Sequence, residues 1–222
     1  EAILRVHARK VKLSPAVDLK TLARATPGFS GADLEAIVNE SALMAVLEGD
    51  EWVEPRHFEE ARDKIRFGRA RKSRAMTSED KRITAYHEAG HALMAELQEA
   101  SGPLHKVTIV PRGMALGLTM QLPEKDRYGL GKKKILCDLR VLFGGRAAEE
   151  LVIGDVTTGA QSDIDRATEL GRLMVTRWGM SEKIGPISYA EGEEHLFLGR
   201  EVTRTVNHSE ETAVAIDQEV KR

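Results

Sequence analysis

The chain has 222 residues, enough for one large domain or two small ones. Its 33 basic and 35 acidic residues give a formal net charge of −2, which argues against a general nucleic-acid-binding protein because such proteins carry a basic excess. No stretch approaches the length of about 18 apolar residues that a membrane-spanning helix needs, and the single cysteine, Cys137, excludes an internal disulfide and any multi-cysteine metal site.

Residues 1–66 are predicted to form a helical unit. Asp18 is a candidate N-cap, and Ser30–Asp33 has the S-x-x-D form of a capping box. Apolar residues then recur at helical spacing through 34–46, and Pro55 stands at an early helix position where proline is tolerated. The pattern favours a compact all-helical unit that is small for an independent domain.

Residues 66–76 contain five basic residues and no acidic one. We interpret 67–76 as a solvated basic linker, since a docking strip for a partner or a phosphate has no further support in the sequence. The linker divides the chain into a first unit at 1–66 and a second unit at 77–222.

The second unit is predicted to be rich in helices. A capping box at Thr77–Asp80 opens a helix that reaches about Glu99, and strand-like runs follow at 105–110 and 116–122. The remaining expected elements are a helix at 132–152 interrupted at Gly144–Gly145, a helix at 162–178, a short strand pair at 192–199 and a helix from about Ser209. The fold class is therefore mainly α with one small β-sheet, and Cys137 is expected to be an inert buried thiol.

The strongest local signal is His87-Glu88-Ala89-Gly90-His91, an H-E-x-x-H pattern. Residues four apart on a helix lie about 40° apart around the axis and one turn apart along it, so both imidazoles can reach one zinc ion. Glu88 lies one step further round, where a carboxylate suits a general base. The composition gives roughly 0.02 expected occurrences of the pattern, and buried imidazoles without partners are costly, so a metal site is favoured over an ordinary helix face.

A catalytic zinc site needs a third protein ligand and one open position. The residue six positions after His91 is Leu97, which excludes a third histidine there, and the other histidines are scattered along the chain. A carboxylate ligand is therefore expected. The candidates are Glu149, Glu150, Asp155, Asp163 and Asp165.

Helical phase ranks these acids. In the expected helix at 162–178, Asp163 falls on an apolar stripe and Asp165 on a polar one. An acid on the buried side of a helix start suits a metal ligand, although N-terminal capping accounts for it as well. Glu149 and Glu150 flank an apolar run, and one of them could orient a metal ligand through a hydrogen bond without binding the metal itself. The residues alone make Asp163 only the best of five.

Six segments resemble the FtsH-type proteases, in which an AAA+ ATPase is fused to a zinc metalloprotease. They run in the family's order over nearly the whole chain: Thr26–Leu34 (TPGFSGADL), Thr84–Leu93 (TAYHEAGHAL), Val107–Gly113 (VTIVPRG), Gly144–Glu150 (GGRAAEE), Thr157–Ile164 (TTGAQSDI) and Trp178–Glu182 (WGMSE). The resemblance implies that 1–66 is the helical lid subdomain of the ATPase, and that 77–222 is a zinc metalloprotease domain truncated at its C-terminal end.

The resemblance also implies site residues and partners. It assigns Asp163 as the third zinc ligand and makes Glu149 a candidate for a residue that hydrogen-bonds to a zinc ligand and orients it. Gly31 and Ala32 match the lid turn that approaches the nucleotide in this family. One Zn²⁺ per chain is expected, with ATP and Mg²⁺ bound only by the full-length protein. The resemblance implies a homohexamer that degrades unfolded or tagged polypeptides, with no nucleic acid, anchored to the membrane through segments absent here and with this chain on the cytoplasmic side.

Peptide-bond hydrolysis is the expected chemistry, with Glu88 as the base and with substrate lying along 116–122 as an added strand. The alternative is a non-catalytic adaptor or interaction module with a structural zinc site, which a fourth protein ligand would support. A nucleotide-driven motor without protease activity is a further rival, and the lack of a phosphate-binding loop in this chain argues against it.

Overall fold

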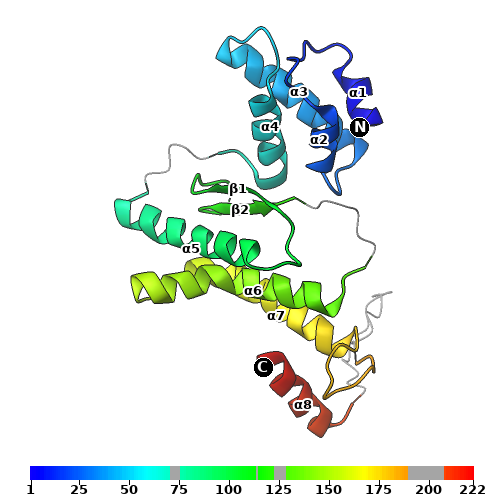
Figure 1. The fold of residues 1–222 in the computed structure, drawn as a ribbon, viewed down its shortest axis with the longest axis vertical. Helices are drawn as coiled ribbons and strands as arrows, with labels where there is room; N and C mark the ends of the chain where they lie inside the picture. The colour runs from blue at the N-terminus through cyan, green and yellow to red at the C-terminus, as the bar shows by residue number, and fades with distance from the viewer. Residues whose placement is uncertain (71–75, 114, 123–128, 190–207) are drawn as a thin grey trace, which may run out of the picture.

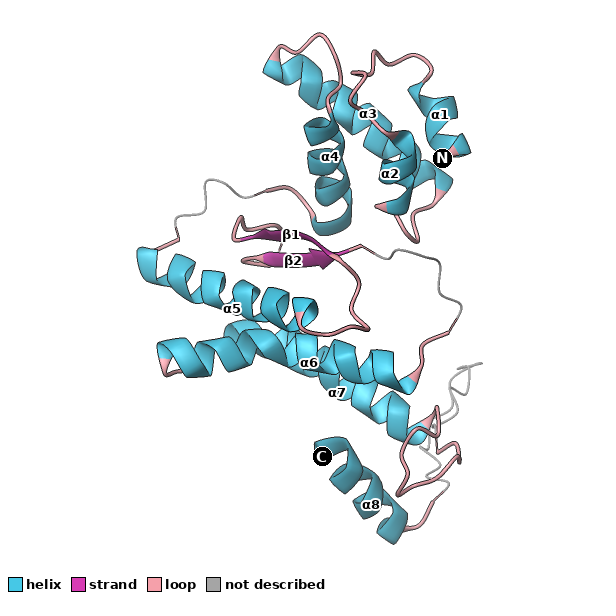
Figure 2. Cartoon of the chain, viewed as in Figure 1, coloured by secondary structure: helices cyan, strands magenta, loops and turns pink. Residues whose placement is uncertain are grey.

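The computed structural model describes residues 1–70, 76–113, 115–122, 129–189 and 208–222. Within these ranges the fold is mainly helical with one two-stranded sheet, which confirms the predicted fold class (Figure 2). The elements are α1 (Ala2–Ala8), α2 (Leu19–Arg24), α3 (Gly31–Glu48), α4 (Pro55–Phe67), α5 (Ser78–Glu96), β1 (Leu104–Thr108), β2 (Leu118–Gln121), α6 (Lys132–Ala148), the π-helix η1 (Glu149–Ile153), the 3₁₀ turn η2 (Thr158–Ala160), α7 (Gln161–Thr176) and α8 (Glu210–Lys221). No described helix combines the length and the hydropathy that a membrane span requires.

Helices α1–α4 pack around one hydrophobic core. The predicted capping box is present, because Ser30 Oγ accepts from the Asp33 amide at 3.2 Å and Asp33 Oδ2 accepts from the Ser30 amide at 2.8 Å. Asp18 caps α2 by accepting from two backbone amides. The core residues include Leu4, Ile37, Val38, Phe58 and Ala61. Gly31 and Ala32 lie exposed in the first turn of α3.

A buried ionic cluster joins α4 to the sheet. The carboxylate of Asp63 is fully buried and accepts from Lys106 Nζ of β1 at 2.7 Å and from Arg62 Nη2 at 2.9 Å. Arg112 follows β1 and binds Glu60 of α4 at 2.6 and 3.1 Å. Burial raises the pKa of Asp63, but the bonds from Lys106 and Arg62 outweigh it and hold that pKa below its ordinary value. The sheet is thereby held between α4 and α5 (Figure 1).

The segment after α4 runs against the loop that follows β1. Helix α4 ends at Phe67, and Ala70 forms an antiparallel bridge with Arg112. At Gly113, φ is +54° and an added Cβ would lie 2.7 Å from the Phe67 carbonyl oxygen, so a side chain would not fit there. The rest of the predicted linker, 71–75, lies outside the described residues.

Strands β1 and β2 are antiparallel, with Leu104 opposite Gln121 and Thr108 opposite Leu118. Strand β2 lies within the predicted run at 116–122, whereas β1 begins one residue before the predicted run at 105–110, and both strands are shorter than predicted. The sheet lies on α5 (Figure 1), so β2 is placed beside the H-E-x-x-H segment.

Helix α6 runs without a break through Gly144 and Gly145, so the predicted interruption is wrong. A Cβ on Gly90 of α5 would lie 2.2 Å from the Gly144 carbonyl oxygen, and a Cβ on Gly144 would lie 2.6 Å from the Gly90 carbonyl oxygen. The two glycines therefore let the backbones of α5 and α6 touch. The irregularity comes later, in the π-helix that starts at Glu149 and ends at Gly154, where φ is +80°.

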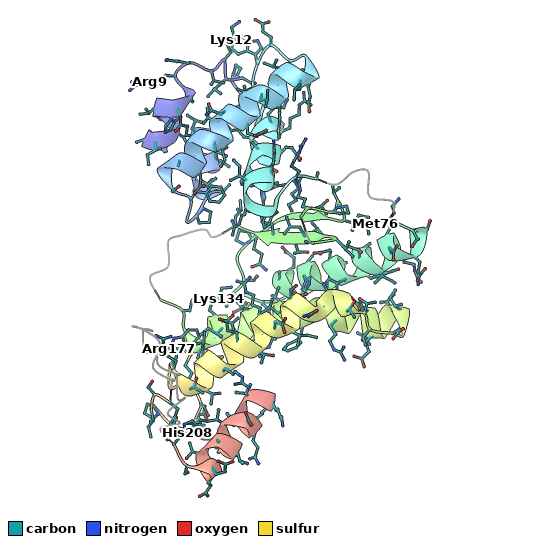
Figure 3. All side chains as sticks on the ribbon, turned by 180° about the vertical axis from the view of Figure 1, so that it is seen from behind. Arg9, Lys12, Met76, Lys134, Arg177 and His208 are labelled. Atoms are coloured by element: carbon teal, nitrogen blue, oxygen red, sulfur yellow. The ribbon has the colours of Figure 1, made fainter. Side chains whose placement is uncertain are left out.

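Helices α7 and α8 complete the described chain. Figure 3 shows Lys134, near the start of α6, at the same end of the α6–α7 pair as Arg177, which follows α7, so the two helices run antiparallel. Helix α8 begins after Ser209, as predicted, and Ser209 Oγ accepts from the Thr212 amide at 3.3 Å. The predicted strand pair at 192–199 lies outside the described residues, and Cys137 is buried.

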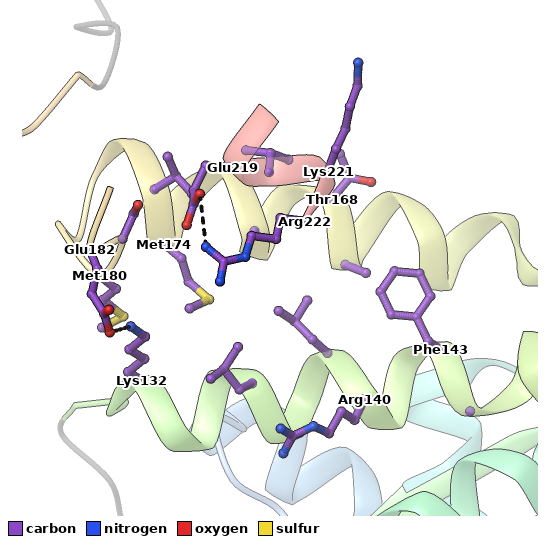
Figure 4. A pocket seen from close by; sticks show the side chains of 18 of the residues that line it. Lys132, Arg140, Phe143, Thr168, Met174, Met180, Glu182, Glu219, Lys221 and Arg222 are labelled. Carbon is purple, nitrogen blue, oxygen red and sulfur yellow. Dashed lines mark hydrogen bonds and ion pairs between the residues drawn. The ribbon is translucent and has the colours of Figure 1, made fainter. Parts of the chain in front are cut away.

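A groove of about 710 Å³ lies between α6, α7 and α8 (Figure 4). Apolar side chains such as Leu136, Met174 and Val220 line it, and the ion pairs Lys132–Glu182 and Arg222–Glu219 lie at its edge. None of the residues of the H-E-x-x-H segment is among the described residues that line this groove.

Candidate metal centre

Three side chains from two helices converge at one point. Helix α5 places His87 and His91 one turn apart, with their Nε2 atoms 3.0 Å from each other. Asp163, in the first turn of α7, brings Oδ2 to 3.3 Å from His87 Nε2 and 3.4 Å from His91 Nε2. All three side chains are mostly buried, so the cluster is shielded from solvent between α5, α6 and α7.

The other four candidate acids lie elsewhere. Glu150, Asp155 and Asp165 are exposed. Glu149 is buried, with 1% of its surface exposed, and lies behind His87 rather than beside the two Nε2 atoms. Asp163 alone among the five contacts both histidines at Nε2.

The outer nitrogens of the two histidines fix their tautomers. His91 Nδ1 lies 2.7 Å from the carbonyl oxygen of Val141, which can only accept, so Nδ1 carries the proton and Nε2 presents a lone pair. His87 Nδ1 likewise donates to Glu149 Oε1 at 2.7 Å, while Glu149 Oε2 accepts from the Thr157 amide at 2.7 Å. A carboxylate or carbonyl behind each imidazole is the arrangement that orients metal-bound histidines in proteins.

The donor set fits zinc. Two nitrogen lone pairs and a carboxylate oxygen face one another across 3.0–3.4 Å, and such groups repel unless a cation or a proton lies among them. Tetrahedral zinc with bonds of about 2.0–2.1 Å has ligand atoms about 3.3–3.4 Å apart, close to these separations. The three atoms therefore fit one face of a tetrahedron, and no fourth histidine, cysteine, aspartate or glutamate of the described residues groups with them.

The pKa shifts of the three side chains show that positive charge is favoured at this site. Burial lowers the pKa of His87 and of His91, but hydrogen bonds to Asp163 outweigh it and hold both above the ordinary value. Burial also raises the pKa of Asp163, and the same two histidines reverse that effect and bring it well below its usual range. Positive charge is thus favoured among these three side chains.

The side chain of Glu88 reaches β2. It is 7% exposed, and its Oε2 accepts from the Thr119 hydroxyl at 2.6 Å. Burial raises the pKa of Glu88, with the hydrogen bond from Thr119 opposing the change. A buried carboxylate that follows a candidate metal ligand in the sequence and has a raised proton affinity has the properties of a general base.

Gly145 leaves the space beside the two Nε2 atoms open. A Cβ at this position would lie 2.7 Å from Nε2 of both His87 and His91. In the sequence, Gly144–Gly145 predicts a helix break, which does not reveal this role. The presence of small residues in both expected helices, Gly90 in one and Gly144–Gly145 in the other, is the sequence signal for a close helix contact.

A second cluster of acids and a histidine, formed by Glu48, Asp50 and His57, has the wrong tautomer for a metal. His57 Nδ1 accepts from the Glu54 amide at 3.0 Å, so the proton is on Nε2, which donates toward Glu48 and Asp50 at 3.2 Å. Arg56 pairs with the same two acids. These contacts hold the loop after α3 against α4.

Comparison with known proteins supports the metal site. The sequence profile of peptidase family M41 matches residues 74–222, and the profile of the AAA+ lid domain matches residues 16–60. The chain is 54% identical to "ATP-dependent zinc metalloprotease FtsH 2" of Methylacidiphilum infernorum over 221 residues, which are 100% of this chain and 34% of that protein.

Two further relatives carry the name "ATP-dependent zinc metalloprotease FtsH". The protein of Caulobacter vibrioides is 52% identical over 224 residues, covering 100% of this chain and 36% of its own length. The protein of Pseudothermotoga lettingae is 51% identical over 223 residues, again with 100% and 36% covered. The chain thus spans about a third of the length of the curated relatives that it matches.

Proposed function

Because this chain belongs to peptidase family M41, we propose that it is the peptidase part of an ATP-dependent zinc metalloprotease and hydrolyses peptide bonds at the His87–His91–Asp163 centre. The observation that carries the proposal is the convergence of two Nε2 lone pairs and one carboxylate oxygen on one point, with no fourth histidine, cysteine, aspartate or glutamate of the described residues grouped there. A zinc ion held there would lower the pKa of a water molecule in its open position to about 7 and polarise a peptide carbonyl.

The chain's own residues supply the other parts of the reaction. Glu88 takes the proton from the attacking water and delivers it to the leaving amine, for which its raised pKa suits it. Glu149 holds His87 in the tautomer that presents Nε2, and Val141 does the same for His91. Burial between the helices keeps bulk solvent from these groups, which strengthens every charge interaction among them.

The substrate is an extended polypeptide. We assign its binding to the free edge of the small sheet at 116–122, since β2 is hydrogen-bonded to β1 on one side and its Thr119 contacts Glu88. A chain added there as a strand would pass the metal centre with its carbonyl groups in a fixed register. Unfolded or tagged proteins fit such a site, because main-chain recognition is largely independent of sequence.

The full-length protein would couple this hydrolysis to ATP. In this proposal, residues 1–66 are the lid subdomain of an AAA+ ATPase, 67–76 are the linker and 77–222 are the protease domain, and the two profile matches support that division. Gly31 and Ala32 are exposed in the first turn of α3, where they can approach ATP and Mg²⁺ bound by the remainder of the ATPase. We also propose assembly as a homohexamer, anchored to the membrane with this chain on the cytoplasmic side, as the resemblance to FtsH-type proteases implies.

A purely structural zinc site is not favoured. Such sites are closed by four protein ligands, whereas the described part of the chain groups only two histidines and one aspartate around this point. The buried carboxylate of Glu88 has no purpose in an adaptor, because burying an acid without a compensating role is costly.

The substitution Glu88→Gln tests the proposal. It removes the base and leaves all three ligands, so one zinc per chain should remain while cleavage of an unfolded protein falls by at least about 100-fold. The matched control is Glu96→Gln, an exposed acid on the same helix, which should change neither quantity. Retained cleavage in the Glu88→Gln protein would refute the mechanism.

A further inference from the structure

The carboxylate of Glu88 lies beside β2 and beside Gly117, the residue that precedes β2. Oε2 accepts from the Thr119 hydroxyl at 2.6 Å, and the same hydroxyl lies 3.1 Å from the Glu88 carbonyl oxygen. A Cβ at Gly117 would lie 2.5 Å from Oε1. Thr119 thus holds one oxygen with its hydroxyl group, and Gly117 makes room for the other by having no side chain.

We propose that Thr119 is a positioning residue for hydrolysis: its hydroxyl holds Oε2 of Glu88 so that Oε1 faces the reacting water. The inference rests on the proposed function of Glu88 as the base. It assigns to β2 a second task besides the binding of substrate, because the strand that borders the substrate also sets the direction of the catalytic carboxylate.

The strength of the contact favours this role. A glutamate side chain has several rotatable bonds, and a hydroxyl bond to an ionised carboxylate at 2.6 Å is of the short, charge-assisted kind that fixes one orientation. The hydroxyl has one hydrogen and two acceptors within reach, and the charged Oε2 is the nearer one. No described residue donates a hydrogen bond to Oε1, which leaves this oxygen for water.

The hydroxyl can keep this contact throughout the reaction. While Oε1 carries the proton taken from water, Oε2 remains an acceptor, and the Thr119 hydroxyl can go on donating to it. A methyl group in place of the hydroxyl could not donate, and a buried oxygen would lose its partner. A serine would retain the donor.

Three variants of the intact zinc-loaded protein test the proposal. Thr119→Val keeps the shape of the side chain and removes the hydroxyl, and Thr119→Ser keeps the hydroxyl. The matched control is Thr108→Val on β1, whose half-buried hydroxyl accepts only from the Val110 amide at 3.1 Å. For each protein, kcat and KM for an unfolded substrate are measured together with zinc bound per chain.

We expect kcat to fall by about 10-fold or more in Thr119→Val, with KM within about twofold and zinc unchanged. Thr119→Ser should stay within about threefold of the original kcat, and Thr108→Val should behave like the original protein. If Thr119→Val lost its zinc through misfolding, Thr119→Ala would replace it in the same comparison.

Two results would overturn the inference. One is an unchanged kcat in Thr119→Val, and the other is an equal loss in Thr108→Val or Thr119→Ser, which would mean that packing of the hairpin matters rather than the hydroxyl. Neither result would touch the proposed function, because that stands or falls with the loss of cleavage in Glu88→Gln.

Discussion

The substitution Gly145→Ala would place a methyl group against the two histidines of the candidate metal centre. The added methyl group would lie 2.7 Å from Nε2 of His87 and of His91, and 2.6 Å from His87 Cε1. Ordinary contact needs about 3.5 Å, so either the histidines or α6 must move by about 0.8 Å. Helix α6 has little freedom to move, because its Gly144 already touches the backbone of α5 at Gly90.

The displacement therefore falls on the two ligands. Metal sites require their ligands within about 0.5 Å of the productive position, and losses of about 10–100-fold in affinity accompany comparable disturbances around zinc. We expect the Kd for Zn²⁺ to rise by at least about 10-fold in Gly145→Ala. The fold should persist, since alanine is the better helix former by up to about 1 kcal/mol.

Competition with a chelator of known zinc affinity measures this Kd, and circular dichroism reports whether the helices remain. The matched control is Gly171→Ala inside α7, where the new Cβ would meet Val220 at an ordinary 3.9 Å. That variant should bind zinc as before and unfold at a slightly higher temperature. An unchanged Kd in Gly145→Ala would refute the claim that this glycine keeps space beside the ligands.

Three further substitutions, the first with a matched control, test the candidate metal centre and the ionic cluster at Asp63. Asp163→Asn should weaken zinc binding by at least about 10-fold because the amide loses the charge, and Asp165→Asn should leave it unchanged; metal content after dialysis distinguishes them. Glu149→Gln should raise the Kd for zinc by about 10–100-fold, as measured by chelator competition, because one amide oxygen cannot accept from both donors that the carboxylate satisfies. Asp63→Asn should lower the free energy of unfolding in urea by about 3–5 kcal/mol, because it leaves Lys106 without its buried partner. The pKa of Asp63 is below its ordinary value in the folded chain. Its contribution to the free energy of unfolding is therefore fully present above the unfolded-state pKa of about 3.9 and disappears as the pH falls through the lower folded-state pKa. Urea titrations at several pH values should show this pH dependence in the original protein and not in Asp63→Asn.

The parts of the site that could be predicted are those encoded by local spacing. His87 and His91 are four residues apart on one helix, so their convergence follows from helix geometry alone. Asp163 was ranked first by helical phase, and it lies beside both histidines at Nε2. The helical phase of Asp163 predicts that it lies on the buried side of α7. It does not predict which helix packs against that side, because the tertiary fold decides this.

Other features depend on contacts between distant segments, and single-sequence reasoning missed them. Asp63 is fully buried only because Lys106 approaches it from a strand 43 residues further along the chain. A charged residue on a helix predicts an exposed position until such a partner is known. Gly144–Gly145 predicted a break because glycine disfavours helices, and the contact with Gly90 outweighs that local preference.

The wide separation of the ligands along the chain also links zinc to folding. His87 and Asp163 are 76 residues apart and approach only when α5 and α7 have docked, so an unfolded chain cannot hold all three ligands in place. Zinc bound by these residues would then stabilise the native state by mass action, by about 2.7 kcal/mol when free zinc is 100 times the Kd. On the proposal that these residues bind zinc, a shortage of zinc would therefore leave a larger fraction of the chain unfolded.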